Sequence, residues 1–163
     1  YNLKYILSLL NSNVINFLFL KQFLNKDIYA FQLQQIPIPK LKNHEQQPYV
    51  DLVELILSLN KELQEISTKF QRTLQRKFEL DNLPKKLENW YELSFAEFIK
   101  ELAKKKVKLS LLEEAEWEDY FLQEQQKAVA IKNEIVATDK AIDKMVYELY
   151  GLTKEEIEIV ENS

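Results

Sequence analysis

The feature that most constrains the fold of this chain is a run of apolar residues spaced alternately four and three positions apart. The residues of this first seam are Leu52, Ile56, Leu59, Leu63, Ile66 and Phe70. Such spacing places apolar side chains along one stripe of an α-helix, as in the heptad repeat of a coiled coil. The pattern predicts a long helix from Tyr49 to about Leu80, with Pro48 in its first turn, where the missing N–H of proline costs little.

A second apolar seam runs from about Leu111 to Tyr150. Its members are Trp117, Phe121, Ala128, Ile131, Ile135, Ile142, Met145 and Leu149, with Glu124 and Thr138 at two further seam positions. An apolar seam is unstable in water on its own, so two seams in one chain predict that the two helices pair. Because a compact segment joins the two seams, we expect the pair to be antiparallel and to form a coiled coil.

The composition indicates the all-α class. The 163 residues include one glycine, four prolines and many Leu, Glu, Lys and Gln, which favour helices. We therefore predict two long antiparallel helices, a small helical tip inserted between them, and short flanking helices. The expected segments are 1–43 before the first long helix, 44–80 for that helix, 81–110 for the tip, 111–151 for the second long helix, and 152–163 for a short C-terminal helix.

The first segment contains two predicted helices and a connector. "LKYILSLL" and "VINFLFLKQFL" (residues 3–10 and 14–24) are apolar on faces wider than a two-helix contact needs, so we expect something outside the chain to cover them. Pro37 and Pro39 favour extended geometry in the residues before them, which makes 31–40 a connector. Because the chain starts at Tyr1, inside an apolar pattern, we expect a piece of a longer protein.

Helix boundaries are marked by capping boxes, in which Ser or Thr is followed three residues later by Glu. Ser94 with Glu97 starts a helix in the tip, Ser110 with Glu113 starts the second long helix, and Thr153 with Glu156 starts the last helix. Gly151, the single glycine, lies where a helix needs a left-handed residue to end, and Leu152 can then fold back on Tyr147 as in a Schellman ending.

Several classes of chemistry are excluded by what the chain lacks. It has no cysteine and one histidine, His44, so thiol catalysis, cysteine-ligated metal sites and two-histidine metal sites are all ruled out. One glycine cannot build a phosphate-binding loop. We therefore expect no catalytic, cofactor-binding or metal-binding residue, and an independent enzyme is not the favoured interpretation.

The net charge is −4, whereas a free-standing nucleic-acid binder is usually basic. Residues 1–80 nevertheless carry a net charge of +3 and residues 81–163 a net charge of −7, so DNA contact is expected in the first half or in a local lysine cluster. The longest apolar stretch, residues 14–20, is too short to span a bilayer, and no signal peptide is evident. We expect a cytoplasmic protein with no membrane contact.

Five stretches resemble segments of a known family. "AIDKMVYELYGLT" is similar to the ending of adenine-specific DNA methyltransferases of restriction–modification systems, and especially of the single-chain type IIG enzymes. "YILSLLNSNVINFLF" resembles the end of their target-recognition domain, and "FQLQQIPIPKL" with "EQQPYVDLVELILSLNKEL" resembles the connector and helix that follow. "KLENWYELSFAEFIKELAKKKVKLSLLEEAEWEDYF" resembles an insertion found in the type IIG group. The likeness is to a TaqI-like C-terminal specificity domain, and it covers nearly the whole chain.

The resemblance implies a role in positioning rather than chemistry. Residues 1–43 would complete the target-recognition domain and its proline connector, and the coiled coil would be a spacer. The longer protein would use S-adenosylmethionine, and magnesium where it also carries a nuclease, to modify double-stranded DNA. The partners implied are that DNA and the methyltransferase and recognition domains of the same chain. The methyltransferase's Asn-Pro-Pro-Tyr motif, its glycine-bearing cofactor loop and the nuclease core are absent here, so no cofactor is expected in these residues.

Candidate DNA-contact residues form two groups. Lys40, Lys42 and Asn43 follow the proline connector, which the resemblance places near the DNA-reading part. Lys104, Lys105 and Lys106 make the tip basic and can contact phosphates as point charges. The alternative interpretation of the first group is a solvated loop, and that of the second is lysine favoured at a helix C-terminus.

Other conspicuous residues are better explained without a ligand. His44 is expected to be an exposed histidine in a polar connector, and the acidic run from Glu113 to Asp119 a solvated helix start. Trp90 and Tyr91 are expected in the core of the tip rather than on a base-stacking surface. The competing function is a coiled-coil adaptor that binds a protein and never meets DNA, which the acidic charge and the wide apolar faces favour.

Overall fold

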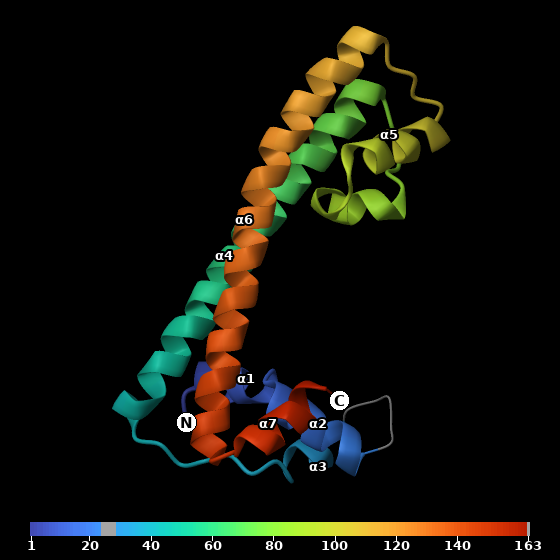
Figure 1. Ribbon diagram of the computed structural model, residues 1–163. Helices are drawn as coiled ribbons and strands as arrows, with labels where there is room; N and C mark the ends of the chain where they lie inside the picture. Colours follow the sequence, from blue (N-terminus) through green and yellow to red (C-terminus); the bar gives the residue numbers. More distant parts are fainter. Residues whose placement is uncertain (24–28, 163) are drawn as a thin grey trace. The chain divides into compact units, whose positions relative to one another are not determined.

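Figure 1 shows the computed structural model, which describes residues 1–23 and 29–162. These residues form helices and no β-strand. The elements are α1 (Leu3–Leu10), α2 (Asn13–Gln22), α3 (Ala30–Leu33), α4 (Asn43–Phe78), the 3₁₀ helix η1 (Lys85–Glu92), α5 (Phe95–Lys104), α6 (Leu111–Tyr150) and α7 (Lys154–Glu161). The all-α class predicted from the sequence is therefore confirmed.

The chain divides into two compact units, which are described separately. The terminal unit consists of Tyr1–Leu57 and Val136–Ser163, and the central unit consists of Ser58–Ile135. Both long helices, α4 and α6, contribute one part to each unit. The division into five functional segments made from the sequence remains a prediction.

In the central unit, ring contacts pair α4 with α6 in opposite order. Phe70 of α4 lies against Phe121 of α6 with ring centroids 6.1 Å apart. Farther along α4, Phe78 lies against Trp117, with centroids 5.1 Å apart. Because the residue number rises on one helix as it falls on the other, the two helices are antiparallel within this unit.

The core of the central unit is built around Phe70, which is 1% exposed. Its ring stacks on that of Trp90 from η1, with centroids 3.7 Å apart and an interplanar angle of 17°, and it also lies 5.9 Å from the ring of Phe98 in α5. Leu87 and Leu102 are buried in the same cluster. The apolar faces of η1 and α5 therefore cover the seam between the long helices, and Trp90 and Tyr91 lie in the core as predicted.

Two glutamines fix the backbone of the tip to the long helices. The Nε2 atom of Gln71 in α4 donates to the carbonyl oxygens of Leu87 and Glu88 at 3.2 and 3.0 Å. The Nε2 atom of Gln125 in α6 donates to the carbonyl oxygens of Tyr91 and Leu93 at 2.9 and 2.7 Å. Each glutamine thus binds two backbone carbonyls of the tip.

The terminal unit packs α1, α2 and α7 with the remaining parts of α4 and α6. Tyr5, Leu9 and Val146 are fully buried in its core. On α4 the buried residues here are Tyr49, Val50 and Val53, while the predicted seam residues Leu52 and Ile56 are only half-buried. The seam shifts because apolar side chains of α1, such as Tyr5, pack on a different side of α4.

Three predicted boundaries differ from the structure. α4 begins at Asn43 rather than Tyr49, since a Glu45 carboxylate oxygen accepts the backbone N–H of Lys42 at 2.6 Å and caps an earlier start. Pro48 therefore lies inside the helix rather than in its first turn. The beginning of the predicted connector forms the short helix α3, and Leu24, the last residue of the predicted second helix, lies outside the described residues.

The predicted capping boxes are all present. Backbone N–H groups of Ser94, Ser110 and Thr153 donate to the paired glutamate side chains at 2.8, 2.9 and 2.8 Å. At the end of α6, Gly151 has a φ of 70°, and the N–H of Leu152 donates to the carbonyl of Tyr147 at 3.0 Å. The single glycine therefore makes the Schellman ending that its position predicts.

Within the described residues, no one helix has both the length and the apolar character needed to cross a membrane, although α1 and α2 together pass that test as a pair bent by 62°.

Candidate functional site

The proline connector is held by two tyrosines that come from opposite ends of the chain. The hydroxyl of Tyr5 in α1 donates to the carbonyl oxygen of Pro39 at 2.9 Å. The hydroxyl of Tyr150, at the end of α6, donates to the carbonyl oxygen of Pro37 at 2.7 Å. These two bonds fix an extended segment whose prolines have no N–H to donate.

Both hydroxyls stay protonated at neutral pH and therefore remain donors. Burial raises the pKa of Tyr150 to about 12. Burial, with a smaller effect from the neighbouring tyrosines Tyr150, Tyr49 and Tyr1, also raises the pKa of Tyr5 to about 12. Phenolate formation would place a charge in an apolar surrounding, which is why the neutral form is favoured.

A carboxylate of α6 binds the N-terminus of α2. The two carboxylate oxygens of Asp143 accept the backbone N–H of Asn13 at 2.8 Å and its side-chain amide at 2.9 Å. A carboxylate at this position satisfies a free N–H group and interacts favourably with the helix dipole. Burial nevertheless raises the pKa of Asp143, and the bond from the Asn13 backbone only partly opposes that effect.

Gln46 joins three segments. Its Oε1 accepts the backbone N–H of Asn2 at 2.8 Å, and its Nε2 donates to the carbonyl oxygen of Leu41 at 2.8 Å. The side chain is 3% exposed, so both bonds are protected from water. Gln46 thus connects the start of the chain and the end of the connector to the first turns of α4.

We call Tyr5, Asn13, Gln46, Asp143 and Tyr150 the junction. Its donors and acceptors bind one another or the backbone, so it holds segments in place rather than presenting reactive groups. A hollow of ≈ 430 Å³ lies beside Asp143 and is lined by polar and apolar side chains of α1, α2, α4 and α6. In the ranges 1–23 and 29–162, no three His, Cys, Asp or Glu residues lie close enough together to hold a metal ion.

The first predicted DNA-contact group lies in the terminal unit. Lys40 is exposed in the loop after Pro39, Lys42 is exposed immediately before α4, and Asn43 is exposed as the first residue of that helix. The backbone N–H of Lys42 donates to the carboxylate of Glu45. The side chain of Lys42 takes no part in this bond. His44 lies in the first turn of α4 rather than in a connector, and it is exposed.

The second predicted group lies in the central unit at the end of α5. Lys104 forms an ion pair with Glu101 at 2.6 Å, so its charge is partly used within the chain. Lys105 is the C-cap of α5, and Lys106 adopts a left-handed φ of 64° beyond it. All three side chains are exposed. The DNA contacts of both groups remain predictions.

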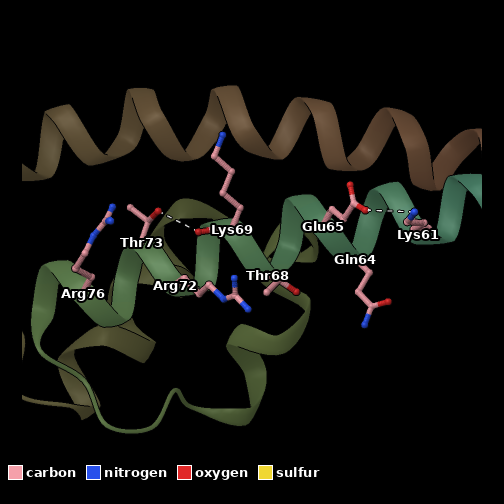
Figure 2. Close-up of a pocket in the computed structure, with 8 residues that line it drawn as sticks. All are labelled: Lys61, Gln64, Glu65, Thr68, Lys69, Arg72, Thr73 and Arg76. Carbon is pink, nitrogen blue, oxygen red and sulfur yellow. Dashed lines mark hydrogen bonds and ion pairs between the residues drawn. The ribbon is translucent and has the colours of Figure 1, made fainter.

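A third cationic surface was not anticipated from the sequence. A hollow of ≈ 720 Å³ lies along α4 in the central unit, and Figure 2 shows that all eight residues lining it come from that helix. Its cations are Lys61, Lys69, Arg72 and Arg76, which we call the basic stripe. The signal was available, because these positions fall on one side of a helix at 3.6 residues per turn, but they are not consecutive in the sequence.

One comparison with known proteins identifies a family. The family described as domain of unknown function DUF8810 matches residues 42–146, and the chain belongs to it. That match includes the whole central unit, with the basic stripe, and two junction residues, Gln46 and Asp143. No curated protein and no solved structure matches the chain.

Proposed function

We propose that this chain is the non-catalytic C-terminal specificity and spacer region of an adenine-specific DNA methyltransferase of a restriction–modification system. The observation that supports the proposal is the junction. The segments that resemble the family are far apart in the sequence, and the hydrogen bonds of the junction join them. Segments that bind one another in the fold are expected to be present together in each member of a family.

Every resembling segment except the insertion supplies a part of the junction. The first segment supplies Tyr5 and Asn13, the connector supplies the carbonyls of Pro37 and Pro39, and the closing segment supplies Asp143 and Tyr150. In this proposal the junction attaches the end of the target-recognition domain to the roots of the long helices. Its rigidity would keep the recognition domain in a fixed relation to the helices that follow it.

We further propose that α4 and α6 form an antiparallel coiled coil that acts as a spacer. The buried residues Leu59, Leu63 and Phe70 on α4 keep the predicted heptad spacing, as do Ile131 and Ile135 on α6. The chemistry would take place elsewhere in the longer protein. There, a flipped adenine would receive the methyl group of S-adenosylmethionine, and no residue of this chain would take part.

The test is to express the complete reading frame that contains this chain and to measure methyl transfer from labelled S-adenosylmethionine to plasmid DNA. We expect N6-methyladenine at one short sequence. The variant Asp143→Ala/Tyr150→Phe should lower methylation at that sequence while S-adenosylmethionine binding is retained. A matched control is Glu155→Gln/Glu158→Gln on α7, which alters exposed charges outside the junction. A reading frame without a methyltransferase core, or a product that never methylates DNA, would show the proposal to be wrong.

The second candidate is a protein-interaction adaptor, which exposed apolar side chains of the terminal unit favour. Leu3 is 81% exposed, Leu20 is 68% exposed and Phe31 is 56% exposed. Exposed apolar groups of this size are typical of surfaces that another protein or domain covers. In the first proposal that cover is the rest of the recognition domain, so the methylation experiment also decides between the two candidates.

A further inference from the structure

We propose that the basic stripe on α4, formed by Lys61, Lys69, Arg72 and Arg76, binds the phosphate backbone of double-stranded DNA. The site lies in the central unit and shares no residue with the two groups that the sequence nominated for DNA contact. Charge and geometry point to a duplex polyanion, and the choice of DNA as that duplex rests on the proposed function.

The stripe lies on the opposite side of α4 from its buried seam. At 3.6 residues per turn, the four cations fall within roughly 80° of helix circumference. Phe70 and Leu74, which are buried against the core, lie roughly 140° and roughly 180° away from the centre of that arc. All four cations are exposed, so a ligand can reach them without any change in the packing of the unit.

Three of the four cations of the stripe form no ion pair within the described residues. Lys69, Arg72 and Arg76 make no ion pair there, and Lys61 meets Glu65 only at 3.9 Å. Lys104 and Lys127, by contrast, bind neighbouring glutamates at 2.6 and 2.5 Å. Between Glu65 and Glu79 the chain has no carboxylate at all. With four cations and one carboxylate among the residues that line the hollow, this surface keeps a net positive charge.

The side chains between the cations suit phosphate oxygens. Gln64 and Thr68 line the same hollow and provide neutral hydrogen-bond donors (Figure 2). The guanidinium groups of Arg72 and Arg76 can each give two parallel N–H bonds to one phosphate. From Lys61 to Arg76 the helix rises about 22 Å. A DNA strand presents roughly six phosphates over that distance, at about 3.4 Å each.

Other ligands fit the stripe less well. A protein interface usually has a buried apolar or aromatic centre, and no residue lining the hollow is apolar or aromatic. Single-stranded nucleic acid binds by stacking bases on exposed aromatic rings, whereas the nearby rings of Phe70 and Trp90 are buried. A surface of four cations with amides, hydroxyls and a single carboxylate, Glu65, has a net positive charge and matches a duplex backbone, whose recognition carries no base sequence.

The test measures binding of this chain to a labelled DNA duplex by fluorescence anisotropy over a range of salt concentrations. We expect weak binding, no tighter than about 10⁻⁴–10⁻⁶ M at physiological salt, that strengthens as salt falls. In the variant Lys69→Gln/Arg72→Gln/Arg76→Gln, the slope of log K against log salt should become less negative by about 2–3, since each phosphate contact contributes about 0.9. Affinity at low salt should fall roughly tenfold or more.

The matched control is Lys132→Gln/Lys140→Gln/Lys144→Gln, which removes the same number of exposed charges from α6. We expect it to leave the slope nearly unchanged, and circular dichroism should show both variants as helical as the original chain. Equal losses in the two variants would mean that net charge alone drives binding and would overturn the inference. So would displacement of the DNA by polyglutamate at equal charge concentration.

A third variant, Lys104→Gln/Lys105→Gln/Lys106→Gln, compares the stripe with the tip lysines. A larger slope change in this variant than in the stripe variant would assign the contact to the tip and reject the stripe. The inference and the proposed function can fail separately. Salt-dependent binding through the stripe without methylation by the complete protein would reject only the proposed function, and methylation without binding through the stripe would reject only the inference.

Discussion

The terminal unit joins distant segments through single polar contacts, whereas the central unit closes over one aromatic cluster. The bond between Asn13 and Asp143 in the terminal unit spans 130 residues of sequence, and the bond between Tyr150 and Pro37 spans 113. In the central unit, the ring of Phe70 alone lies within about 6 Å of four other rings, those of Trp90, Phe98, Tyr120 and Phe121. Both units have an apolar core, but the polar contacts of the terminal unit join segments much farther apart in the sequence than those of the central unit do.

Polar contacts and aromatic packing differ in how strictly they determine the residue at each position. A polar contact needs particular atoms at particular places, so few substitutions preserve it. An aromatic core tolerates exchange among large apolar residues of similar volume. The junction therefore needs particular side chains at particular positions, whereas the core of the central unit needs apolar side chains of suitable volume.

The largest expected effect is on the aromatic cluster. Phe70→Ala should destabilise the central unit by about 3–5 kcal/mol, because it removes a fully packed ring and leaves a cavity. Hydrogen exchange should show faster exchange of amides in 58–135, with little change around Tyr5 and Val146. The counterpart is Leu9→Ala, a fully buried residue of the terminal unit, which should give the reverse pattern. If either variant accelerated amide exchange equally in both units, the two units would unfold together and would not differ in local stability.

A smaller effect is expected at the junction. Asp143→Ala should cost about 1–3 kcal/mol, because it leaves the N–H of Asn13 without its acceptor. Asp143→Asn keeps one acceptor oxygen and should cost less. A double-mutant cycle with Asn13→Ala, measured by urea unfolding, should give a coupling energy of at least about 0.5 kcal/mol. A coupling near zero would show that the side-chain bond contributes nothing.

The pH dependence of Asp143 has a definite sign. Burial raises its pKa in the folded protein above the usual value near 3.8, so the folded state binds the proton more tightly than the unfolded state does. The unfolding free energy of the original chain minus that of Asp143→Asn should therefore increase as pH falls from neutral through the raised pKa. It should level off once pH is below the pKa that Asp143 has in the unfolded chain. A difference that decreases over this range would contradict the raised pKa.

The sequence predicted those parts of the fold that depend on local spacing. Leu59, Leu63 and Phe70 are buried as the seam required, and so are Trp117, Phe121, Ala128, Ile131, Ile135 and Ile142, whereas the seam residues Ile66, Met145 and Leu149 are half-buried. Capping boxes were also recognisable, since both partners lie within one turn. Where packing depends on a third element, the prediction was wrong: Leu52 and Ile56 are only half-buried, because α1 draws Tyr49, Val50 and Val53 into the core instead.

The candidate sites were harder to predict for two different reasons. Spacing cannot pair Asn13 with Asp143 across 130 residues, so only a family resemblance drew attention to their segments. The basic stripe, in contrast, could have been found from helical phase alone. Adjacent lysines such as Lys104 to Lys106 are conspicuous in the sequence, whereas residues that share one face of a helix stand three or four positions apart.

Helix endings give the finest comparison between the units. The terminal unit ends α6 with Gly151 at φ 70°, while the central unit uses Glu79 at φ 50° and Lys106 at φ 64° after α4 and α5. Leu80 and Val107 donate back to Gln75 and Leu102 at 3.0 and 3.3 Å, the same Schellman pattern that follows Gly151. Glycine marks such an ending in the sequence, and Glu or Lys does not, which is why only one of the three was predicted.

The smallest expected effects test this comparison. A Cβ atom at Gly151 would meet nothing within 4 Å, so Gly151→Ala isolates the backbone cost of a left-handed residue and should destabilise the chain by about 1–2 kcal/mol. Lys106→Gly removes that cost but adds freedom to the unfolded chain, so it should stabilise by less than about 1 kcal/mol. Thermal unfolding of both variants measures these changes: the melting temperature should fall in Gly151→Ala and rise slightly in Lys106→Gly. If Lys106→Gly destabilised the chain as much as Gly151→Ala does, the side chain of Lys106 would have to make a contact worth more than its backbone strain.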